Sequence, residues 1–158
     1  MKTNQINTWR KSSNHLREQW KNQLKKETYK ERLQRKGLAE LKKILRECLH
    51  EYIRIRDCDK PCVSCGEYKK LQAGHYYPAG KVESLRFETD NIHGQCLPCN
   101  YHEHGNLSFY RIELERRIGK ERLEKLDARA VQYRRDGFYK WNKFELIDLI
   151  IKYKYEKI

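Results

Sequence analysis

Two short cysteine motifs decide how the middle of this chain must fold. The first is Pro61-Cys62-Val63-Ser64-Cys65-Gly66 and the second is Cys96-Leu97-Pro98-Cys99, with 30 residues between Cys65 and Cys96. Two thiolates separated by two residues can bind one tetrahedral ion, and the glycine lets backbone N–H groups turn toward the sulfurs. The pattern predicts one structural zinc ion bound by Cys62, Cys65, Cys96 and Cys99.

The rest of the composition favours zinc over disulfides, which remain the alternative together with free thiols. The first residues, MKTNQINTWRK, lack the apolar core of a secretory signal. The expected compartment is therefore the reducing cytoplasm, where paired cysteines more often bind metal. Cys48 is expected in a helix core, and Cys58 is either a spare ligand or has no role. No apolar run approaches the roughly 20 residues that a bilayer crossing requires, so a transmembrane protein is excluded.

Positive charge is concentrated at the two ends of the chain. The 158 residues contain 35 Lys and Arg against 22 Asp and Glu, a net charge of +13. Residues 1–57 have a net charge of +9, residues 58–106 of −1 and residues 107–158 of +5. We predict three segments with these bounds: a basic helical N-terminal arm, a zinc-stabilised core and a helical C-terminal region. The arms are expected to contact phosphates, although solvated helix faces are the alternative.

Apolar residues at three- and four-residue steps predict helices in both arms. Gly37, Gly119 and Asp136-Gly137 are the expected breaks between them. The predicted apolar stripes are Trp9, Leu16, Trp20 and Leu24; Leu38, Leu41, Leu45, Cys48, Leu49, Tyr52 and Ile55; Leu107, Tyr110, Leu114 and Ile118; Leu123, Leu126 and Ala130; and Phe144, Ile147, Ile151 and Tyr155 with Leu146, Leu149 and Ile150. Each stripe is expected to be buried against the fold or against a second copy of the chain.

Between the cysteine motifs, glycines, prolines and short apolar pieces indicate strands and turns. Residues 71–77 are predicted as a strand that presents an accessible His75, and residues 85–95 return toward the second motif. If the return is extended, Asn91, His93 and Gln95 lie on one face. Residues 100–104 are predicted to begin a helix. A strand-strand-helix unit would bring His75, Asn91 and Asn100 into one cleft.

The order His75, Asn91, Asn100 through paired cysteine motifs resembles the HNH, or ββα-metal, nuclease motif in its variant with asparagine at the third position. More narrowly, the chain is similar to the NinG/Rap family of lambdoid phages. The residues that carry this likeness are Tyr52-Ile53-Arg54-Ile55-Arg56-Asp57, Pro61-Cys62-Val63-Ser64-Cys65-Gly66, Ala73-Gly74-His75-Tyr76, Asn91-Ile92-His93-Gly94-Gln95-Cys96, Cys99-Asn100-Tyr101-His102 and Gly105-Asn106-Leu107. It covers residues 50–119 closely and the basic helices loosely.

The resemblance implies a fold and an activity. The expected fold is α+β and mostly helical, with a small zinc-bound ββα-metal (HNH) core flanked by basic helices. Members of the family are structure-specific endonucleases of recombination that cut branched DNA such as D-loops and Holliday junctions. For this chain the resemblance therefore implies a metal-dependent endonuclease on branched double-stranded DNA. A homodimer is expected because a four-way junction offers two symmetric strands and paired cuts need two sites. No membrane partner is expected, and the expected location is the cytoplasm of a bacterial host that carries the phage or prophage. The alternative is a non-catalytic, zinc-stabilised nucleic-acid-binding module.

The resemblance also implies roles for single residues. His75 would be the general base that activates a water, which suits its ordinary pKa near 6.5. Asn91 would orient His75 or brace the loop, and Asn100 would bind the hydrolytic cation, Mg²⁺ or Mn²⁺. The second-tier ligands or phosphate contacts would be His93, His102, Glu103 and His104. The expected products carry a 5′ phosphate and a 3′ hydroxyl.

One position departs from the wider nuclease pattern. The residue before the base is often a metal-binding aspartate, and here it is Gly74, which the narrower family tolerates. Glu103 would supply the missing oxygen ligand or is simply a solvent-exposed charge. Taken singly, each asparagine also has a structural reading: Asn91 as a turn residue and Asn100 as a helix N-cap. Taken singly, His75 could be a packed strand residue.

Overall fold

The computed structural model of the chain describes the backbone of residues 2–155 and the side chains of residues 15–155. Its fold is α+β and mostly helical, with one antiparallel two-stranded sheet. The helices are α1 (Lys2–Gln34), α2 (Leu38–Arg56), α3 (Leu107–Ile118), α4 (Lys120–Asp136) and α5 (Lys143–Tyr155), and the strands are β1 (Leu71–His75) and β2 (Ile92–Cys96). Short helical turns at Glu83–Leu85, Thr89–Asn91 and Pro98–His102 connect them.

Glycines end or separate the helices where the sequence predicts. Gly37 lies between α1 and α2, and Gly119 separates α3 from α4 with a φ of 80°. Gly137 follows α4 with a φ of 68°, and its N–H donates to the carbonyl of Tyr133 at 2.9 Å. A left-handed residue of this kind satisfies a free carbonyl of the last helical turn. The predicted breaks are confirmed.

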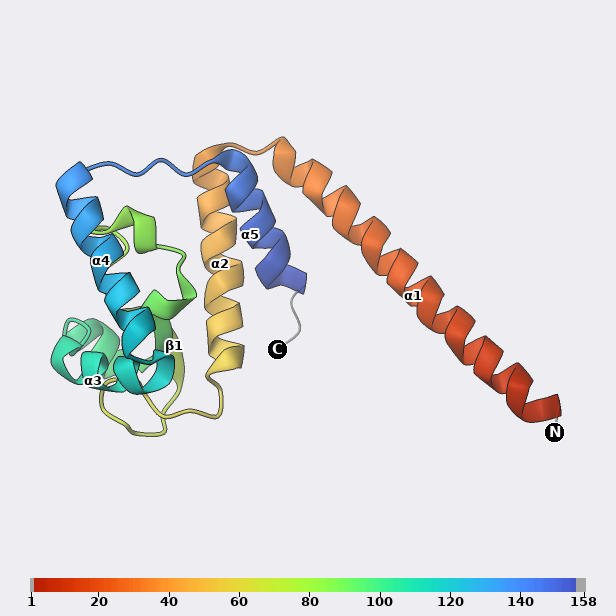
Figure 1. Cartoon of the computed structure of the whole chain (residues 1–158), viewed down its shortest axis with the longest axis horizontal. Coiled ribbons are helices and arrows are strands. Elements are labelled where there is room, and N and C mark those ends of the chain that lie inside the picture. The colour runs from red at the N-terminus through yellow and green to blue at the C-terminus, as the bar shows by residue number, and fades with distance from the viewer. Residues whose placement is uncertain (1, 156–158) are drawn as a thin grey trace.

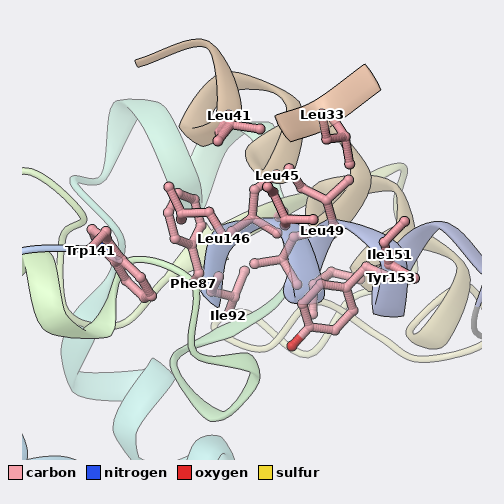
Figure 2. Close-up of a cluster of buried hydrophobic side chains, with 14 residues drawn as sticks. Leu33, Leu41, Leu45, Leu49, Phe87, Ile92, Trp141, Leu146, Ile151 and Tyr153 are labelled. Carbon is pink, nitrogen blue, oxygen red and sulfur yellow. The ribbon is translucent and has the colours of Figure 1, made fainter. Parts of the chain in front are cut away.

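The main hydrophobic core lies between α2, α5 and one face of the sheet (Figures 1 and 2). Helix α2 contributes residues four apart, Leu41, Leu45, Leu49 and Ile53, which form a single stripe. The sequence prediction was wrong at the edges of this stripe: Leu38 and Ile55 are 39% and 53% exposed. Ile53 is buried in place of Ile55 because positions two apart on a helix point to nearly opposite sides.

In α5 the buried positions are Leu146, Ile147, Ile150, Ile151 and Tyr153. The predicted broad apolar face is therefore confirmed, except at its two ends, where Phe144 is 63% and Tyr155 37% exposed. Figure 2 shows Leu146, Ile151 and Tyr153 of α5 facing the leucines of α2 across the core. Trp141, in the segment before α5, packs its ring against Phe87 at a centroid distance of 5.0 Å. The core thus joins the N-terminal arm, the middle and the C-terminal region.

A second core lies under α3 and α4. The residues that form it are Val63, Val82, Leu85, Tyr110, Leu114, Ile118, Leu123, Leu126 and Ala130. The stripes predicted for these two helices are confirmed, apart from Leu107, which is 41% exposed. Because this core includes Val63, it attaches the first cysteine motif to α3.

Helix α1 projects away from the body of the molecule (Figure 1). Its stripe is not buried within the chain: Leu16, Trp20 and Leu24 are 52%, 69% and 57% exposed. The side chain of Trp9 lies outside the described residues. The end of the helix joins the core, through the fully buried Leu33 and the partly buried Tyr29. No helix in the described part of the chain combines the length and the apolar character that crossing a bilayer requires.

The sheet and the turn after it differ from the sequence prediction in length. Strand β1 ends at His75, which pairs with Ile92, and Gly74 pairs with His93. The helix expected at residues 100–104 is a single π-helical turn that ends at His102. Three successive positive φ angles, 51°, 93° and 44° at residues 104–106, then stop the helix. Helix α3 begins only afterwards, at Leu107.

Candidate functional site

The four cysteines gather as the sequence predicts. The sulfur atoms of Cys62, Cys65, Cys96 and Cys99, the four-cysteine cluster, all lie within 4.8 Å of one another. Cys65 Sγ and Cys96 Sγ are 3.8 Å apart. A tetrahedral zinc ion with bonds of about 2.3 Å would space its sulfurs by about 3.8 Å, so the arrangement fits such an ion. The other two cysteines lie elsewhere: Cys48 packs against the main core and Cys58 is exposed.

Backbone hydrogen bonds shape the four-cysteine cluster. The N–H groups of Ser64 and Cys96 donate to Cys62 Sγ at 3.4 and 3.3 Å. Burial raises the pKa of the Cys62 thiol, but these N–H donors outweigh it and lower the pKa overall. Gly66, at a φ of 72°, provides the left-handed turn that closes the first motif. The N–H of Val63 donates to the carbonyl of Gly94 at 3.0 Å, which attaches that motif to β2.

His75 stands at the end of β1 with its ring oriented by the backbone. Its Nε2 lies 3.0 Å from the carbonyl oxygen of Arg86. A carbonyl only accepts, so Nε2 carries the proton and Nδ1 is the basic nitrogen. Within the described residues the ring makes no second hydrogen bond. Burial lowers the pKa of His75, the bond to the carbonyl partly opposes this, and the charge of Arg86 lowers it further. The imidazole is therefore neutral at pH 7.

His75 lines a cavity of about 540 Å³ on the side of the sheet that faces α2. We call this cavity the α2 cleft. Its polar lining consists of Lys42, Lys43, Arg46, His50, His75 and Arg86, and its apolar lining of Ala39, Ala79 and Phe87. The rings of His50 and His75 meet edge to face, 5.9 Å between centroids. Burial and then the proximity of His75 lower the pKa of His50 to about 4, so both imidazoles are uncharged at neutral pH.

Asn91 is fully buried and braces the loop between the strands. Its Nδ2 donates to the carbonyls of Tyr77 and Leu85 at 2.9 and 3.0 Å, and its Oδ1 accepts from the N–H of Tyr77 at 2.7 Å. Since Arg86 directly follows Leu85, the same brace sets the position of the carbonyl that orients His75. Two roles are expected for Asn91, orienting His75 or bracing the loop, and its hydrogen bonds fit the second.

Asn100 lies on the other side of β1 from His75. Its Nδ2 donates to Gln72 Oε1 at 3.2 Å. Successive side chains of a strand alternate between its faces, so Gln72 and Gly74 share one face and His75 the other. Neither Asn91 nor Asn100 lines the α2 cleft. The prediction of one cleft shared by His75, Asn91 and Asn100 is corrected accordingly.

His93 is buried in a setting that does not suit a metal ligand. Its Nδ1 lies 3.0 Å from Nη2 of Arg56, which can only donate, so Nδ1 accepts and Nε2 carries the proton. A cation on Nε2 would require the ring to lose that proton as well. Burial and the charge of Arg56 lower the pKa of His93 to about 3, while the more distant Asp57 carboxylate opposes the shift. His93 is thus a neutral residue of the interior.

The remaining predicted ligands, His102, Glu103 and His104, are exposed on the turn before α3. Glu103 Oε2 accepts from Asn106 Nδ2 at 2.6 Å. Among the described side chains, the four-cysteine cluster is the one group of three or more His, Cys, Asp or Glu close enough to share an ion. His93, His102, Glu103 and His104 therefore do not bring three such ligand atoms to one ion within the described residues.

The packing around Gly74 explains why no aspartate stands before His75. A Cβ atom at Gly74 would lie 2.8 Å from Cβ of Gln95, closer than side-chain carbons approach. Gln95 cannot easily move, because it is fully buried and its Nε2 donates to Ser64 Oγ at 2.7 Å and to the carbonyl of Gly105 at 2.6 Å. The glutamine thus fills the space that an aspartate would need.

Gly74→Ala is accordingly expected to lower the free energy of unfolding by about 1–3 kcal/mol, the usual cost of overpacking a core. The measurement is urea denaturation followed by circular dichroism. Gly80→Ala is the matched control, since nothing lies within 4 Å of a Cβ atom there. The control is expected to be neutral or slightly stabilising. Equal midpoints for the two variants would contradict this account of Gly74.

Sequence reasoning missed the cations that surround His75. Lys42, Arg46 and His50 follow one another at four-residue steps, so they share one face of α2. That spacing was a usable signal, although it did not indicate what the face contacts. Arg86 had no signal of its own, because the loop that contains it reaches the cleft only through tertiary packing.

The chain was also compared with known proteins. A family model described as "Bacteriophage Lambda NinG protein" matches residues 1–157. Protein ninG of Escherichia phage lambda and of Escherichia phage 933W are each 42% identical to this chain over 90 residues, and that of Salmonella phage P22 is 40% identical over 90 residues. Those residues are 56% of this chain and 44–45% of each relative, so the match spans less than half of the relatives' length. No solved structure matches.

Proposed function

The chain belongs to the bacteriophage lambda NinG family, and on that premise we propose that it is an HNH-type endonuclease that hydrolyses phosphodiester bonds in branched double-stranded DNA. One observation carries the proposal. His75, at the end of a strand held by the four-cysteine cluster, has its Nε2 bonded to a backbone carbonyl and leaves Nδ1 as a free base beside a cationic cavity. That is the arrangement a general base for phosphate chemistry requires.

The proposed reaction is the attack of a water on the scissile phosphorus. Nδ1 of His75 takes one proton from the water as its oxygen forms the new P–O bond. The bond to the 3′ oxygen breaks, and that oxygen takes a proton from solvent. The products are a 5′ phosphate and a 3′ hydroxyl. The imidazolium formed on the way is stabilised because Nε2–H already donates to the carbonyl of Arg86.

The proposal includes two metal ions with different roles, one structural and one in hydrolysis. Zinc in the four-cysteine cluster would be structural, because four thiolates leave it no open position for substrate. A requirement for Mg²⁺ or Mn²⁺ follows from the family resemblance, with Asn100 as the oxygen donor. The expected His and Glu donors do not bring three ligand atoms to one ion within the described residues, so we derive no step of the reaction from this second cation.

We propose further that the enzyme acts as a homodimer in the cytoplasm of the phage's bacterial host. A four-way junction presents two equivalent strands, and paired cuts require two active sites related by symmetry. The exposed stripe of Leu16, Trp20 and Leu24 on α1 is a surface that a second copy would cover.

A second function is favoured by the position of Asn100. Because Asn100 and His75 lie on opposite faces of β1, a zinc-stabilised module that binds nucleic acid without cutting it remains the competing proposal. The basic arms suit both proposals equally.

Cleavage of synthetic DNA distinguishes the two. The wild-type protein is expected to cut four-way junctions, D-loops or flaps in Mg²⁺ or Mn²⁺ and to leave linear duplex largely intact, with little preference for base sequence. Product ends are identified by their ability to be ligated and labelled. A well-folded, zinc-loaded protein that binds these substrates and cuts none of them with any divalent ion would support the binding module.

A further inference from the structure

We infer that the α2 cleft is a binding site for a backbone phosphate of DNA, with Lys43 and Arg46 as its principal ligands beside His75. The inference rests on the proposed function and extends it by assigning the residues that hold the scissile strand. It concerns binding, and it can therefore be tested whether or not the chain cuts DNA.

The charges in and around the cleft are unbalanced. Lys42 Nζ lies 2.7 Å from Glu83, and Arg86 Nε lies 2.8 Å from the same carboxylate. Lys43 and Arg46, by contrast, make no ion pair with any described residue. Four cations therefore share one carboxylate, and both histidines are neutral. The cleft has an excess positive charge of about three units, which attracts an anion.

The fold has no structural use for the two unpaired cations, Lys43 and Arg46. Arg46 lies three residues after Lys43 and four after Lys42 on α2, and like charges at these spacings destabilise a helix. They are exposed or half-buried, and they surround a cavity instead of packing against another element. An anionic ligand in the cavity would relieve the repulsion between these cations, and that relief would favour its binding.

The support beneath these side chains is rigid. Leu41, Leu45 and Leu49, on the adjoining face of α2, are fully buried in the main core, as Figure 2 shows. The side chains on the cleft face therefore project from a helix whose rotation is set by packing. A guanidinium such as that of Arg46 can donate two parallel hydrogen bonds to one phosphate, and the ammonium of Lys43 adds a point charge. A cavity of about 540 Å³ is large enough for a phosphodiester and part of its sugars.

The position of the cleft would place a bound phosphate next to the proposed general base, His75. A phosphate held by Lys43 and Arg46 would lie in the cavity that His75 also lines, where its negative charge grows during attack by water. Fixed protein cations aimed at developing charge are an effective form of transition-state stabilisation. In this chain Lys43 and Arg46 would supply that positive charge next to the base.

The test is equilibrium binding to a synthetic four-way junction without added divalent cation, measured by fluorescence anisotropy. The double variant Lys43→Gln/Arg46→Gln is expected to bind on the order of 10- to 100-fold more weakly, because it removes two cations that neutralise phosphates. Each neutralised phosphate also contributes about 0.9 to the steepness with which log K falls against log salt. Since the two side chains are proposed to bind one phosphate, titrations between about 50 and 200 mM salt should show a slope shallower by about one unit.

The matched control is Arg134→Gln/Arg135→Gln, which removes the same charge from the exposed end of α4 at two residues that do not line the cleft. It is expected to change affinity and slope much less. Equal losses of affinity in the two double variants would overturn the inference, because the cleft would then contribute only net charge. So would an unchanged slope in the Lys43/Arg46 variant. If the wild type never cuts DNA but the two variants differ as expected, the endonuclease proposal fails and the phosphate site stands.

Discussion

Removal of the metal from the four-cysteine cluster is expected to unfold the segment between the two cysteine motifs and the sheet with it. Metal binding to sites of this kind contributes about 10–16 kcal/mol at neutral pH. That is comparable to the roughly 5–15 kcal/mol by which whole domains are stable. The first motif is also linked to β2 and to the turn before α3, because Gln95 of β2 donates both to Ser64 and to the carbonyl of Gly105. Helices α2 and α5 keep their own apolar contacts, so helical content should fall only in part.

The measurement combines native mass spectrometry with thermal unfolding. One zinc per chain is expected before treatment, and a high-affinity chelator should remove it and abolish the main unfolding transition. Cys62→Ser should act like the chelator, whereas Cys58→Ser should keep both the zinc and the transition, because Cys58 is exposed and outside the cluster. A metal-free protein with the wild-type transition would show that the cysteines do not bind a structural ion.

His75→Ala is expected to lower the rate of junction cleavage by about 10²–10⁴-fold, the usual contribution of a general base. Junction affinity should stay near the wild-type value, because a neutral imidazole adds no charge to the cleft. Single-turnover cleavage and anisotropy titration measure the two quantities separately. His15→Ala, which removes an exposed imidazole from the projecting part of α1, is the matched control and should cut at the wild-type rate.

The pH profile of cleavage gives this prediction a second readout. The base must be unprotonated to accept a proton, and burial lowers the pKa of His75 below its ordinary value of 6.5. The rate should therefore be insensitive to this group at pH 7 and above, and should fall only at a pH below 6.5 as His75 becomes protonated. Cleavage by His75→Ala at the wild-type rate, or a rate limited by a group that titrates above pH 7, would remove His75 from the proposed role.

Much of the local structure of this chain can be predicted from sequence because it depends on contacts between near neighbours. The four-residue spacing of Leu41, Leu45 and Leu49 predicts the buried face of α2, and the left-handed glycines at 119 and 137 predict helix ends. The sequence did not predict the π-helical turn at Pro98–His102. Residues 100–104 have a helical pattern, but the next residues adopt positive φ angles that nothing in that pattern indicates.

The candidate site could also be predicted from the sequence only in part. The four cysteines and the histidine at the end of β1 are recognisable one motif at a time. The positions of Asn91 and Asn100 relative to His75 depend on strand alternation and on the register of β1 with β2, which pairs Gly74 with His93. A single residue of register or of strand length moves a side chain to the other face, and periodicity does not specify either.

By itself, the sequence determined that two paired cysteine motifs lie between basic helices, because the spacing of cysteines and apolar residues encodes those features locally. Only the tertiary structure decided which groups surround His75. Lys43 and Arg46 reach it because α2 packs over the sheet, and the carbonyl of Arg86 reaches it because Asn91 holds the loop. Asn100 lies on the other side of β1 because it donates to Gln72, whose side chain points to the face opposite that of His75. Such contacts between distant segments are set by packing and register, which no local pattern records.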